Sequence, residues 1–312
     1  MATSEQFSGG GIVSHGTTSN EGLILQPGAT LVRNPIYIDR VERKYLVDVD
    51  EMEMAGFFRD LTSFLAPYGV HPVQEITNVG TCYFDNRDYD LLRYILLIRR
   101  CHILVRLRAY EYYDGPPEPI SEYWMEVKIR DADRRRKKRF RLKKLTLRDF
   151  LIGQDVVEKV IEENHDEADP ETIRKLFSET RETFFTWGLR PTLFVNYKRI
   201  AFQSGKERLS LDWDIQYYPT DDNVYSYDSW KYPVEPVAGK AKKIVMELKY
   251  PEGTVPAWIA QLERKYPIVE RNYVKPVDGM GFLFEGPLRA HREAESFSRM
   301  VNAYKSETQP LG

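Results

Sequence analysis

The sequence predicts an α+β fold in which an antiparallel β-barrel forms a tunnel and helices pack outside it. The first observation is an alternation that recurs from strand to strand, with aliphatic residues on one face and Arg or Lys on the other. Arg106 and Arg108 share a face, and Val105 and Leu107 share the opposite one, because successive strand side chains point to opposite sides. The second observation is a set of amphipathic helical segments that can cover the aliphatic faces. Closing such a sheet directs its cations toward one axis.

The first half of the chain supplies most of the expected strands. Residues 1–34 have little periodicity and are expected to be a flexible tail ahead of one domain over residues 35–305. The first helix has an apolar stripe from Met54 to Leu65 and ends at Pro67, which cannot continue a helix. The expected strands of this half cover 36–49, 76–84, 103–111, 121–130 and 135–145, and the expected helices cover 51–66 and 89–98.

The second half begins with a helical stretch between residues 147 and 186. Asp169 and Pro170 mark the start of its last helix, because Asp caps a helix and Pro suits the first helical position. A hairpin with strands at 191–203 and 207–217 follows, then a loop rich in Tyr, Asp and Pro at 221–236. The remaining expected elements are a strand at 243–250, helices at 256–265 and 290–304, and a short tail at 306–312.

Composition excludes several classes of protein. The 312 residues carry a formal net charge of −2, so no overall basic field draws the chain to nucleic acid. Two cysteines, Cys82 and Cys101, exclude a Cys/His zinc site and suit a reducing compartment. No apolar run approaches the roughly 20 residues of a membrane span, and the longest run is interrupted by Arg93. We therefore expect a cytoplasmic protein without a transmembrane segment. A partner protein would bring it to the inner face of a membrane.

A single cationic strand face is an ordinary solvated surface, because Arg and Lys are common on exposed strands. Several such faces together are different, since like charges on neighbouring strands repel one another. We therefore expect a polyanion in the lumen, and a phosphate chain suits Arg forks and Lys point charges. Among the carboxylates on these faces, Glu42 and Asp214 are expected to form ion pairs. Glu247 stands in an otherwise apolar strand and is expected to bind Mg²⁺ or Mn²⁺.

Short segments along the chain, taken in order, carry a family resemblance. The segments are Val41–Tyr45, Thr81–Asn86, Val105–Arg108, Met125–Lys128, Lys138–Phe140, Asn196–Phe202, Arg208–Asp212 and Met246–Lys249. The set resembles the VTC domain of the vacuolar transporter chaperone complex, a branch of the triphosphate tunnel metalloenzymes, over roughly residues 36–304. The resemblance implies an antiparallel β-barrel tunnel whose basic lumen holds polyphosphate and whose metal-bound entrance accepts a nucleotide.

The resemblance also implies roles for individual side chains. Glu247 matches the metal-binding glutamate, and Lys275 matches a late lysine through a weaker local pattern. The residues expected to grip phosphates and act in catalysis are Arg106, Arg108, Lys128, Arg199, Arg208 and Lys275. Further phosphate- or polyphosphate-binding residues are expected to be Lys44, Arg130, Tyr197, Ser210 and either Lys137 or Arg139, whose register is ambiguous in a basic run.

Two positions depart from the wider superfamily. Its first strand reads ExExK, whereas this chain has Arg40 in place of the first glutamate, ahead of Glu42 and Lys44. This departure argues against a cyclase or a thiamine triphosphatase and fits the VTC branch. In the wider superfamily a histidine follows the lysine of the central strand by two positions, whereas this chain has Arg130 two positions after Lys128. Arg130 keeps a cation that can bind phosphate, but it does not replace the histidine as a proton shuttle.

The resemblance implies a metal-dependent polyphosphate polymerase that transfers the γ-phosphate of ATP to a growing chain, with ATP and inorganic polyphosphate as partners. Phosphoryl transfer needs positioning and charge neutralisation more than covalent chemistry. Two alternatives stay open: a tripolyphosphatase or nucleoside triphosphatase in the same tunnel, and a non-catalytic polyphosphate-binding module. The basic run Arg134–Lys144 leaves contact with nucleic acid or anionic lipid open, although a hairpin wall also explains it. Gly205-Lys206-Glu207 lacks the upstream glycine and the Ser/Thr of a P-loop.

Overall fold

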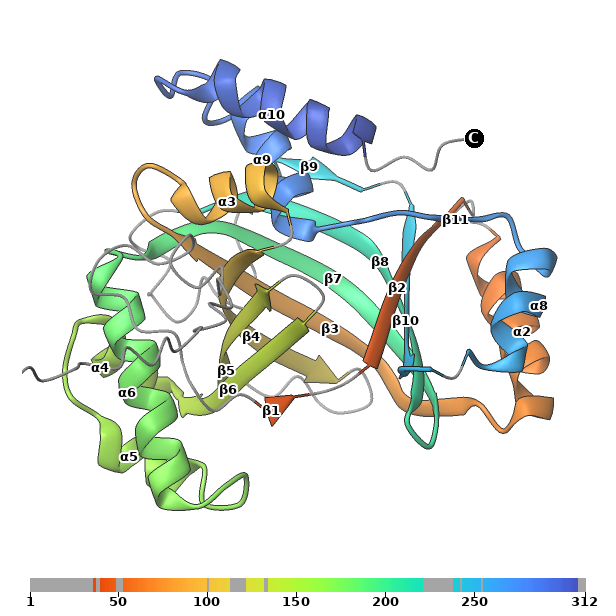
Figure 1. Cartoon of the computed structure of the whole chain (residues 1–312), viewed down its shortest axis with the longest axis horizontal. Coiled ribbons are helices and arrows are strands. Elements are labelled where there is room, and N and C mark those ends of the chain that lie inside the picture. Colours follow the sequence, from red (N-terminus) through yellow and green to blue (C-terminus); the bar gives the residue numbers. More distant parts are fainter. Residues whose placement is uncertain are drawn as a thin grey trace, which may run out of the picture.

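The computed structural model describes residues 36–37, 40–48, 53–99, 101–112, 122–131, 134–220, 238–241, 243–253 and 255–307. Its strands are β1 (Ile36–Tyr37), β2 (Arg40–Val47), β3 (His71–Asp85), β4 (Cys101–Tyr112), β5 (Glu122–Asp131), β6 (Arg134–Lys143), β7 (Arg190–Ser204), β8 (Glu207–Pro219), β9 (Gly239–Lys240), β10 (Ile244–Pro251) and β11 (Ile268–Glu270). They form one curved antiparallel sheet in the order β1-β6-β5-β4-β3-β7-β8-β10-β2-β11, and β9 pairs with β8 (Figure 1). Among the described residues, β1 and β11 end this order without pairing with each other.

Helices surround the sheet in three groups, each with its own apolar core (Figure 1). The first group comprises α4 (Lys144–Leu151), α5 (Val157–Glu163) and α6 (Pro170–Thr186). The second comprises α2 (Met54–Leu65), which continues into the 3₁₀ turn η1 (Ala66–Tyr68), and α8 (Ala257–Lys265). The third comprises α3 (Asp90–Ile98), α9 (Lys275–Glu285) and α10 (Ala294–Glu307).

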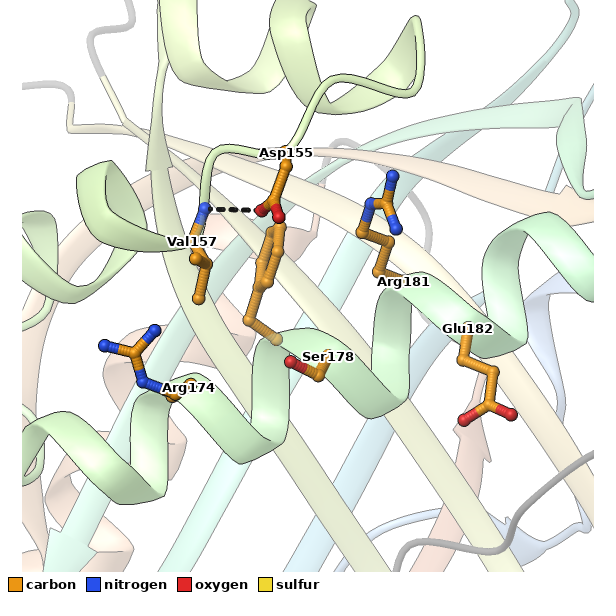
Figure 2. A pocket seen from close by; sticks show the side chains of 7 residues that line it. Asp155, Val157, Arg174, Ser178, Arg181 and Glu182 are labelled. Atoms are coloured by element: carbon orange, nitrogen blue, oxygen red, sulfur yellow. Dashed lines mark hydrogen bonds between the residues drawn. The ribbon is translucent and has the colours of Figure 1, made fainter.

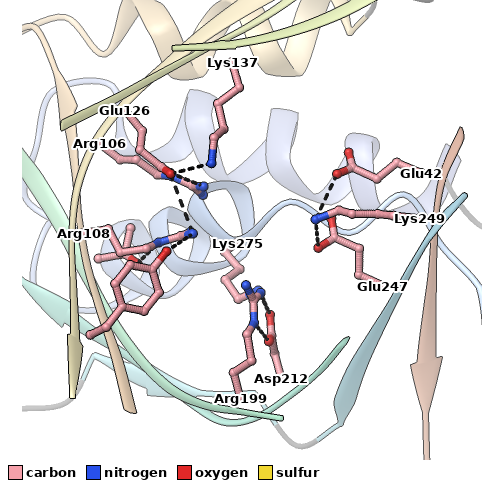
Figure 3. A network of polar contacts seen from close by, with 12 residues as sticks. Glu42, Arg106, Arg108, Glu126, Lys137, Arg199, Asp212, Glu247, Lys249 and Lys275 are labelled. Atoms are coloured by element: carbon pink, nitrogen blue, oxygen red, sulfur yellow. Dashed lines mark hydrogen bonds and ion pairs between the residues drawn. The ribbon is translucent and has the colours of Figure 1, made fainter. Parts of the chain in front are cut away.

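The two faces of the sheet follow the alternation that the sequence predicts. Val105 and Leu107 are buried in the core beneath α4 to α6, on the outer face. Arg106 and Arg108, which alternate with them, point inward (Figure 3). The group of α4, α5 and α6 and the group of α2 and α8 therefore cover the outer face. The third group instead packs over inward-facing side chains such as Tyr197, which share its core.

The α+β fold class with an antiparallel tunnel-type sheet is confirmed, and so are most of the expected elements. Asp169 caps α6, and its side chain accepts a hydrogen bond of 2.9 Å from the Thr172 amide, as the sequence predicts. Helix α9 was not predicted, because Gly279 and Gly281 hide its helical pattern. A Cβ at Gly279 would lie 2.6 Å from the Tyr217 ring, so this glycine allows α9 to approach β8 closely. The expected tail at 1–34 and loop at 221–236 lie outside the described residues.

Candidate functional site

Charged side chains from both halves of the sheet point toward one another on its inner face (Figure 3). Each comes from a strand position that alternates with buried apolar residues, except Lys275, which begins helix α9. We call this set, together with Tyr197, which lies among its cations, the interior cluster. Its members are Glu42, Lys44, Arg106, Arg108, Glu126, Lys128, Lys137, Tyr197, Arg199, Asp212, Glu247, Lys249 and Lys275.

Glu126 is the centre of the first group in the cluster. Its Oε2 lies 2.6 Å from Arg106 Nη2 and 3.7 Å from Arg108 Nη1, and its Oε1 accepts a hydrogen bond of 2.8 Å from Lys137 Nζ. The residue has no exposed surface. Burial raises the pKa of Glu126, but Arg106, Arg108 and Lys137 hold that pKa well below its usual range. The carboxylate is therefore charged and orients three cations.

The same contact distinguishes Lys137 from Arg139, whose register the sequence left ambiguous. Lys137 reaches Glu126, whereas the guanidinium of Arg139 stacks 4.2 Å from the Trp124 ring centroid and its side chain is 40% exposed. Both side chains lie on the same face of β6, two residues apart. Lys137 therefore belongs to the interior cluster, whereas Arg139 contacts Trp124 and lies 3.8 Å from Glu167 instead.

Asp212 is the centre of the second group. Arg199 donates to both carboxylate oxygens, from Nε to Oδ1 at 2.5 Å and from Nη2 to Oδ2 at 2.7 Å. Lys275 Nζ donates to Oδ2 at 2.6 Å. Burial raises the pKa of Asp212, but Arg199 and Lys275 outweigh it and lower this pKa to about 2. The wall of β7 and β8 is thereby joined to the first residue of α9.

Tyr197 lies beneath the second group. The Lys275 ammonium is 4.5 Å from the ring centroid, and the Arg199 guanidinium carbon is 5.4 Å from it. Its hydroxyl is buried and has no hydrogen-bond partner among the described residues. Burial raises the pKa of this phenol, but Arg108, Arg199 and Lys275 lower it below its usual value. A buried donor without a partner, surrounded by cations, suits an anionic ligand.

Lys249 links two carboxylates in the third group. Its Nζ lies 2.8 Å from Glu247 Oε2 and 3.3 Å from Glu42 Oε1, which confirms that Glu42 is an ion-pair partner. Burial raises the pKa of Glu247, but Lys249, Lys44 and Lys128 hold it well below its usual range. Two charged carboxylates that share one ammonium are hard oxygen donors, and such donors fit Mg²⁺ or Mn²⁺ completed by phosphate oxygens. The described residues contain no group of three or more His, Cys, Asp or Glu arranged to hold a metal ion.

Lys128 and Lys44 are the cluster lysines that form no ion pair with a carboxylate of the described residues. Within the described part of the chain, Lys128 makes no hydrogen bond or ion pair, and Lys44 donates a hydrogen bond of 2.8 Å to the Tyr273 carbonyl oxygen. Burial and repulsion from Arg106 hold the pKa of Lys128 well below its usual range. An anion bound beside Lys128 would favour its charged form.

The other expected site residues lie around the cluster. Ser210 is buried and faces Glu247 across the β8–β10 pair, and Arg208 faces Lys249 in the same register. Burial raises the pKa of Tyr304 in α10, and Arg130 is close enough to oppose part of this rise. The interior cluster also contains Glu126, Asp212 and Lys249, which the sequence analysis did not select. Their position on the same strand faces as the expected cations was the signal for them.

A separate pocket of about 410 Å³ lies among the outer helices (Figure 2). Arg174, Ser178 and Arg181 of α6 line one side of it, and Asp155 and Val157 line the other. It contains none of the interior cluster. Among the described residues, no helix is both long enough and apolar enough to cross a membrane.

Comparison with known proteins agrees with this geometry. The family model described as VTC domain matches residues 39–280. The vacuolar transporter chaperone complex subunit 4 of Trypanosoma brucei brucei is 26% identical over 173 residues, which are 49% of this chain and 21% of that protein. The match thus spans about a fifth of the length of this curated relative.

Solved structures align with the chain at low similarity. The PH1819 protein from Pyrococcus horikoshii OT3 aligns with a TM-score of 0.34 at 12% identity, over 72% of this chain and 86% of its own. HpAC1 from Hippeastrum, described with a dominant triphosphatase activity, aligns with a TM-score of 0.36 at 13% identity, over 76% of this chain and 92% of its own. The assignment rests on the family model, which covers most of the chain, including every residue of the interior cluster: this protein belongs to the VTC domain family.

Proposed function

We propose that the protein is a metal-dependent polyphosphate polymerase, which transfers the γ-phosphate of ATP to the end of a growing inorganic polyphosphate chain. Membership of the VTC domain family supports this function, as does the name of the relative, a subunit of the vacuolar transporter chaperone complex. The observation that carries the proposal is the interior cluster itself. Its cations outnumber its carboxylates and line opposite walls of one lumen, an arrangement suited to a linear polyanion.

Phosphoryl transfer requires the protein to position the two phosphate groups and to neutralise their negative charge. An oxygen of the terminal phosphate of the chain forms a bond to the γ-phosphorus of ATP, while the bond from that phosphorus to the β–γ bridging oxygen breaks and ADP leaves. Arg106 and Arg108 would neutralise phosphoryl oxygens from one wall, and Arg199 and Lys275 would do so from the other. No protein nucleophile is needed.

The remaining expected residues have supporting roles in this proposal. Lys128 and Lys44 would hold phosphates of the nucleotide or the chain, as would Arg208, Arg130 and Ser210 at the edges of the cluster. Glu247, with Glu42 beside it, would hold Mn²⁺ or Mg²⁺. Such an ion supplies charge neutralisation on the nucleotide phosphates when it is bound.

We also infer the setting of this activity. The tunnel domain would comprise residues 35–305 and act in the cytoplasm, and a partner would bring it to the inner face of a membrane. The name of the relative, which identifies it as a subunit of a complex, supports the existence of such a partner.

The first test is incubation of the purified protein with ATP and Mn²⁺, in parallel with inorganic tripolyphosphate and Mn²⁺. Products are resolved on polyacrylamide gels with a polyphosphate stain and assayed for free phosphate and ADP. A ladder of long chains together with ADP supports the polymerase. Free phosphate without chains would replace it with the hydrolase, and tight, salt-dependent polyphosphate binding without turnover would replace it with a binding module.

A further inference from the structure

The first residue of helix α9 is joined to the tunnel wall by a buried carboxylate. Asp212 lies on β8, opposite Arg199 of β7 in the strand register, and Lys275 is the first residue of α9. Asp212 is 1% exposed and contacts both cations, with Arg199 Nη2 and Lys275 Nζ sharing Oδ2 at 2.7 and 2.6 Å. The two cations therefore share one carboxylate oxygen.

Physical chemistry makes this position of Lys275 unfavourable without Asp212. The first turn of a helix carries the positive end of the helix dipole, so a lysine there is repelled. Lys275 also lies near Lys44, which adds further repulsion, and near Arg199, since both contact one carboxylate. Asp212 supplies the negative charge that offsets all three.

The contact leaves donors for a ligand. Asp212 engages Nε and Nη2 of Arg199, and in the described part of the chain Nη1 makes no hydrogen bond. The ammonium of Lys275 donates only to Asp212 among the described residues and has two further hydrogens. The Tyr197 ring lies against both cations, and its buried hydroxyl has no partner in that part of the chain. Arg199 Nη1, the Lys275 ammonium and the Tyr197 hydroxyl therefore keep donors available for a ligand.

We propose that Asp212 is a positioning residue, which holds Arg199 of the wall and Lys275 of α9 at the spacing that a transferring phosphoryl group requires. Asp212 acts through these two cations and does not contact the phosphate. This role rests on the proposed function, in which Arg199 and Lys275 neutralise phosphoryl oxygens. It explains why a carboxylate is buried in a lumen that must attract polyanions.

The chain offers a matched control two residues away on β8. Asp214 also pairs with two lysines, Lys198 at 3.2 Å and Lys240 at 2.8 Å, and its pKa is also about 2, with burial raising it and Lys240 among the groups that lower it. Neither lysine belongs to the interior cluster. Asp212→Asn and Asp214→Asn therefore make the same chemical change inside and outside the proposed site.

The first measurement is hydrogen exchange by mass spectrometry on the full chain. Asp212→Asn keeps the shape of the side chain but removes its charge, so Lys275 is released and exchange rises in peptides that contain the first turn of α9. Asp214→Asn leaves those peptides at the wild-type rate. Unchanged exchange in Asp212→Asn would overturn the proposal, and this readout does not depend on turnover.

The second measurement is a kinetic cycle with Asp212→Asn, Lys275→Met and the double variant, using ATP and Mn²⁺. Charge-assisted contacts of this kind predict a loss of about tenfold to a hundredfold in kcat for Asp212→Asn. KM for ATP changes by less than about threefold, because removing a negative charge does not weaken attraction to a polyanion. In the Lys275→Met background, Asp212→Asn lowers kcat by less than about threefold further.

Each outcome of the cycle decides between roles. Equal losses in both backgrounds would mean that Asp212 does not act through Lys275, and a raised Mn²⁺ requirement would mean that it binds the metal directly; either result overturns the proposal. If the wild-type protein turns over neither ATP nor tripolyphosphate, the proposed function fails. The exchange experiment then decides the role of Asp212 independently.

Discussion

Arg106 Nη2 lies 2.6 Å from Glu126 Oε2 in the interior of the tunnel, with the two side chains only 8% and 0% exposed. The pair sits in direct register across β4 and β5, so the contact follows from strand pairing. Breaking a buried pair from one side leaves an uncompensated charge, which costs far more than the pair contributes as a whole.

Glu126→Gln is expected to lower the free energy of unfolding by about 3–5 kcal/mol, because it leaves Arg106, Arg108 and Lys137 together without a counter-charge. Urea denaturation at neutral pH measures the change. Added tripolyphosphate should recover part of the loss, since a bound anion replaces the missing charge. Glu122→Gln is the control, because Glu122 lies on the same strand, is 45% exposed and pairs with Arg141 at 3.8 Å. A change below 1 kcal/mol in Glu126→Gln would contradict the role of Glu126 as counter-ion; this threshold is on the order of one hydrogen bond.

The pKa of Asp212, lowered from 3.8 to about 2, makes stability depend on pH. A depressed carboxylate pKa stabilises the fold above its unfolded value, and the contribution is lost as pH falls through its folded value. The contribution is about 2 kcal/mol above about pH 4 and disappears toward about pH 2. The difference in unfolding free energy between wild type and Asp212→Asn should shrink over this window. A difference that stays constant with pH would show that the charge of Asp212 is not what stabilises the fold.

Lys137 titrates near the working range, since burial lowers its pKa to about 8, with Glu126 partly opposing the shift. A bound phosphate favours the charged ammonium, so the affinity for tripolyphosphate should fall as pH rises from about 7 to about 9. Lys137→Arg should flatten this dependence, because a guanidinium stays charged throughout. Isothermal titration calorimetry at several pH values measures both. Identical pH profiles in the two proteins would place Lys137 outside the binding site.

Lys128 is expected to favour anion binding at a cost to the stability of the fold, since it is partly buried and makes no ion pair with the described residues. Lys128→Met removes a poorly solvated charge, so its melting temperature should stay level or rise. Its affinity for tripolyphosphate should fall about tenfold, as expected for the loss of one charge-assisted contact. Calorimetric binding and thermal unfolding on one preparation test both halves. A variant that both melts lower and binds normally would contradict this assignment.

Glu247→Gln should raise the Mn²⁺ concentration for half-maximal turnover by about tenfold to a hundredfold, as for the loss of a ligand or its immediate support. Glu42→Gln should have a smaller effect in the same direction, because Glu42 Oε1 is 3.3 Å from Lys249 Nζ and Glu247 Oε2 is 2.8 Å from it. Metal titrations of turnover measure both variants. If Glu247→Ala stays active with an unchanged metal requirement, the metal is held elsewhere.

The direction of each side chain was available from the sequence. A strand places residues two apart on one face whatever surrounds it, so Arg106, Arg108, Lys128 and Glu247 could be assigned to one face from alternation alone. The helices with clear apolar stripes, such as α2, followed for the same local reason. These features depend on neighbours along the chain.

The pairing of these side chains was decided by the tertiary structure. Lys137 and Arg139 have the same local pattern, and the strand register places Arg139 directly opposite Glu126. It is nevertheless Lys137, opposite Lys128, that reaches Glu126 diagonally, while Arg139 stacks on Trp124. Helix α9 could not be recognised in the sequence because Gly279 is a weak helix former. The tertiary structure requires glycine there, since α9 packs closely against β8 at this position. The contact of Asp212 with Lys275 joins residues far apart in sequence. Alternation is a property of one strand, whereas a contact across the lumen depends on the curvature of the whole sheet and the helix that packs over it.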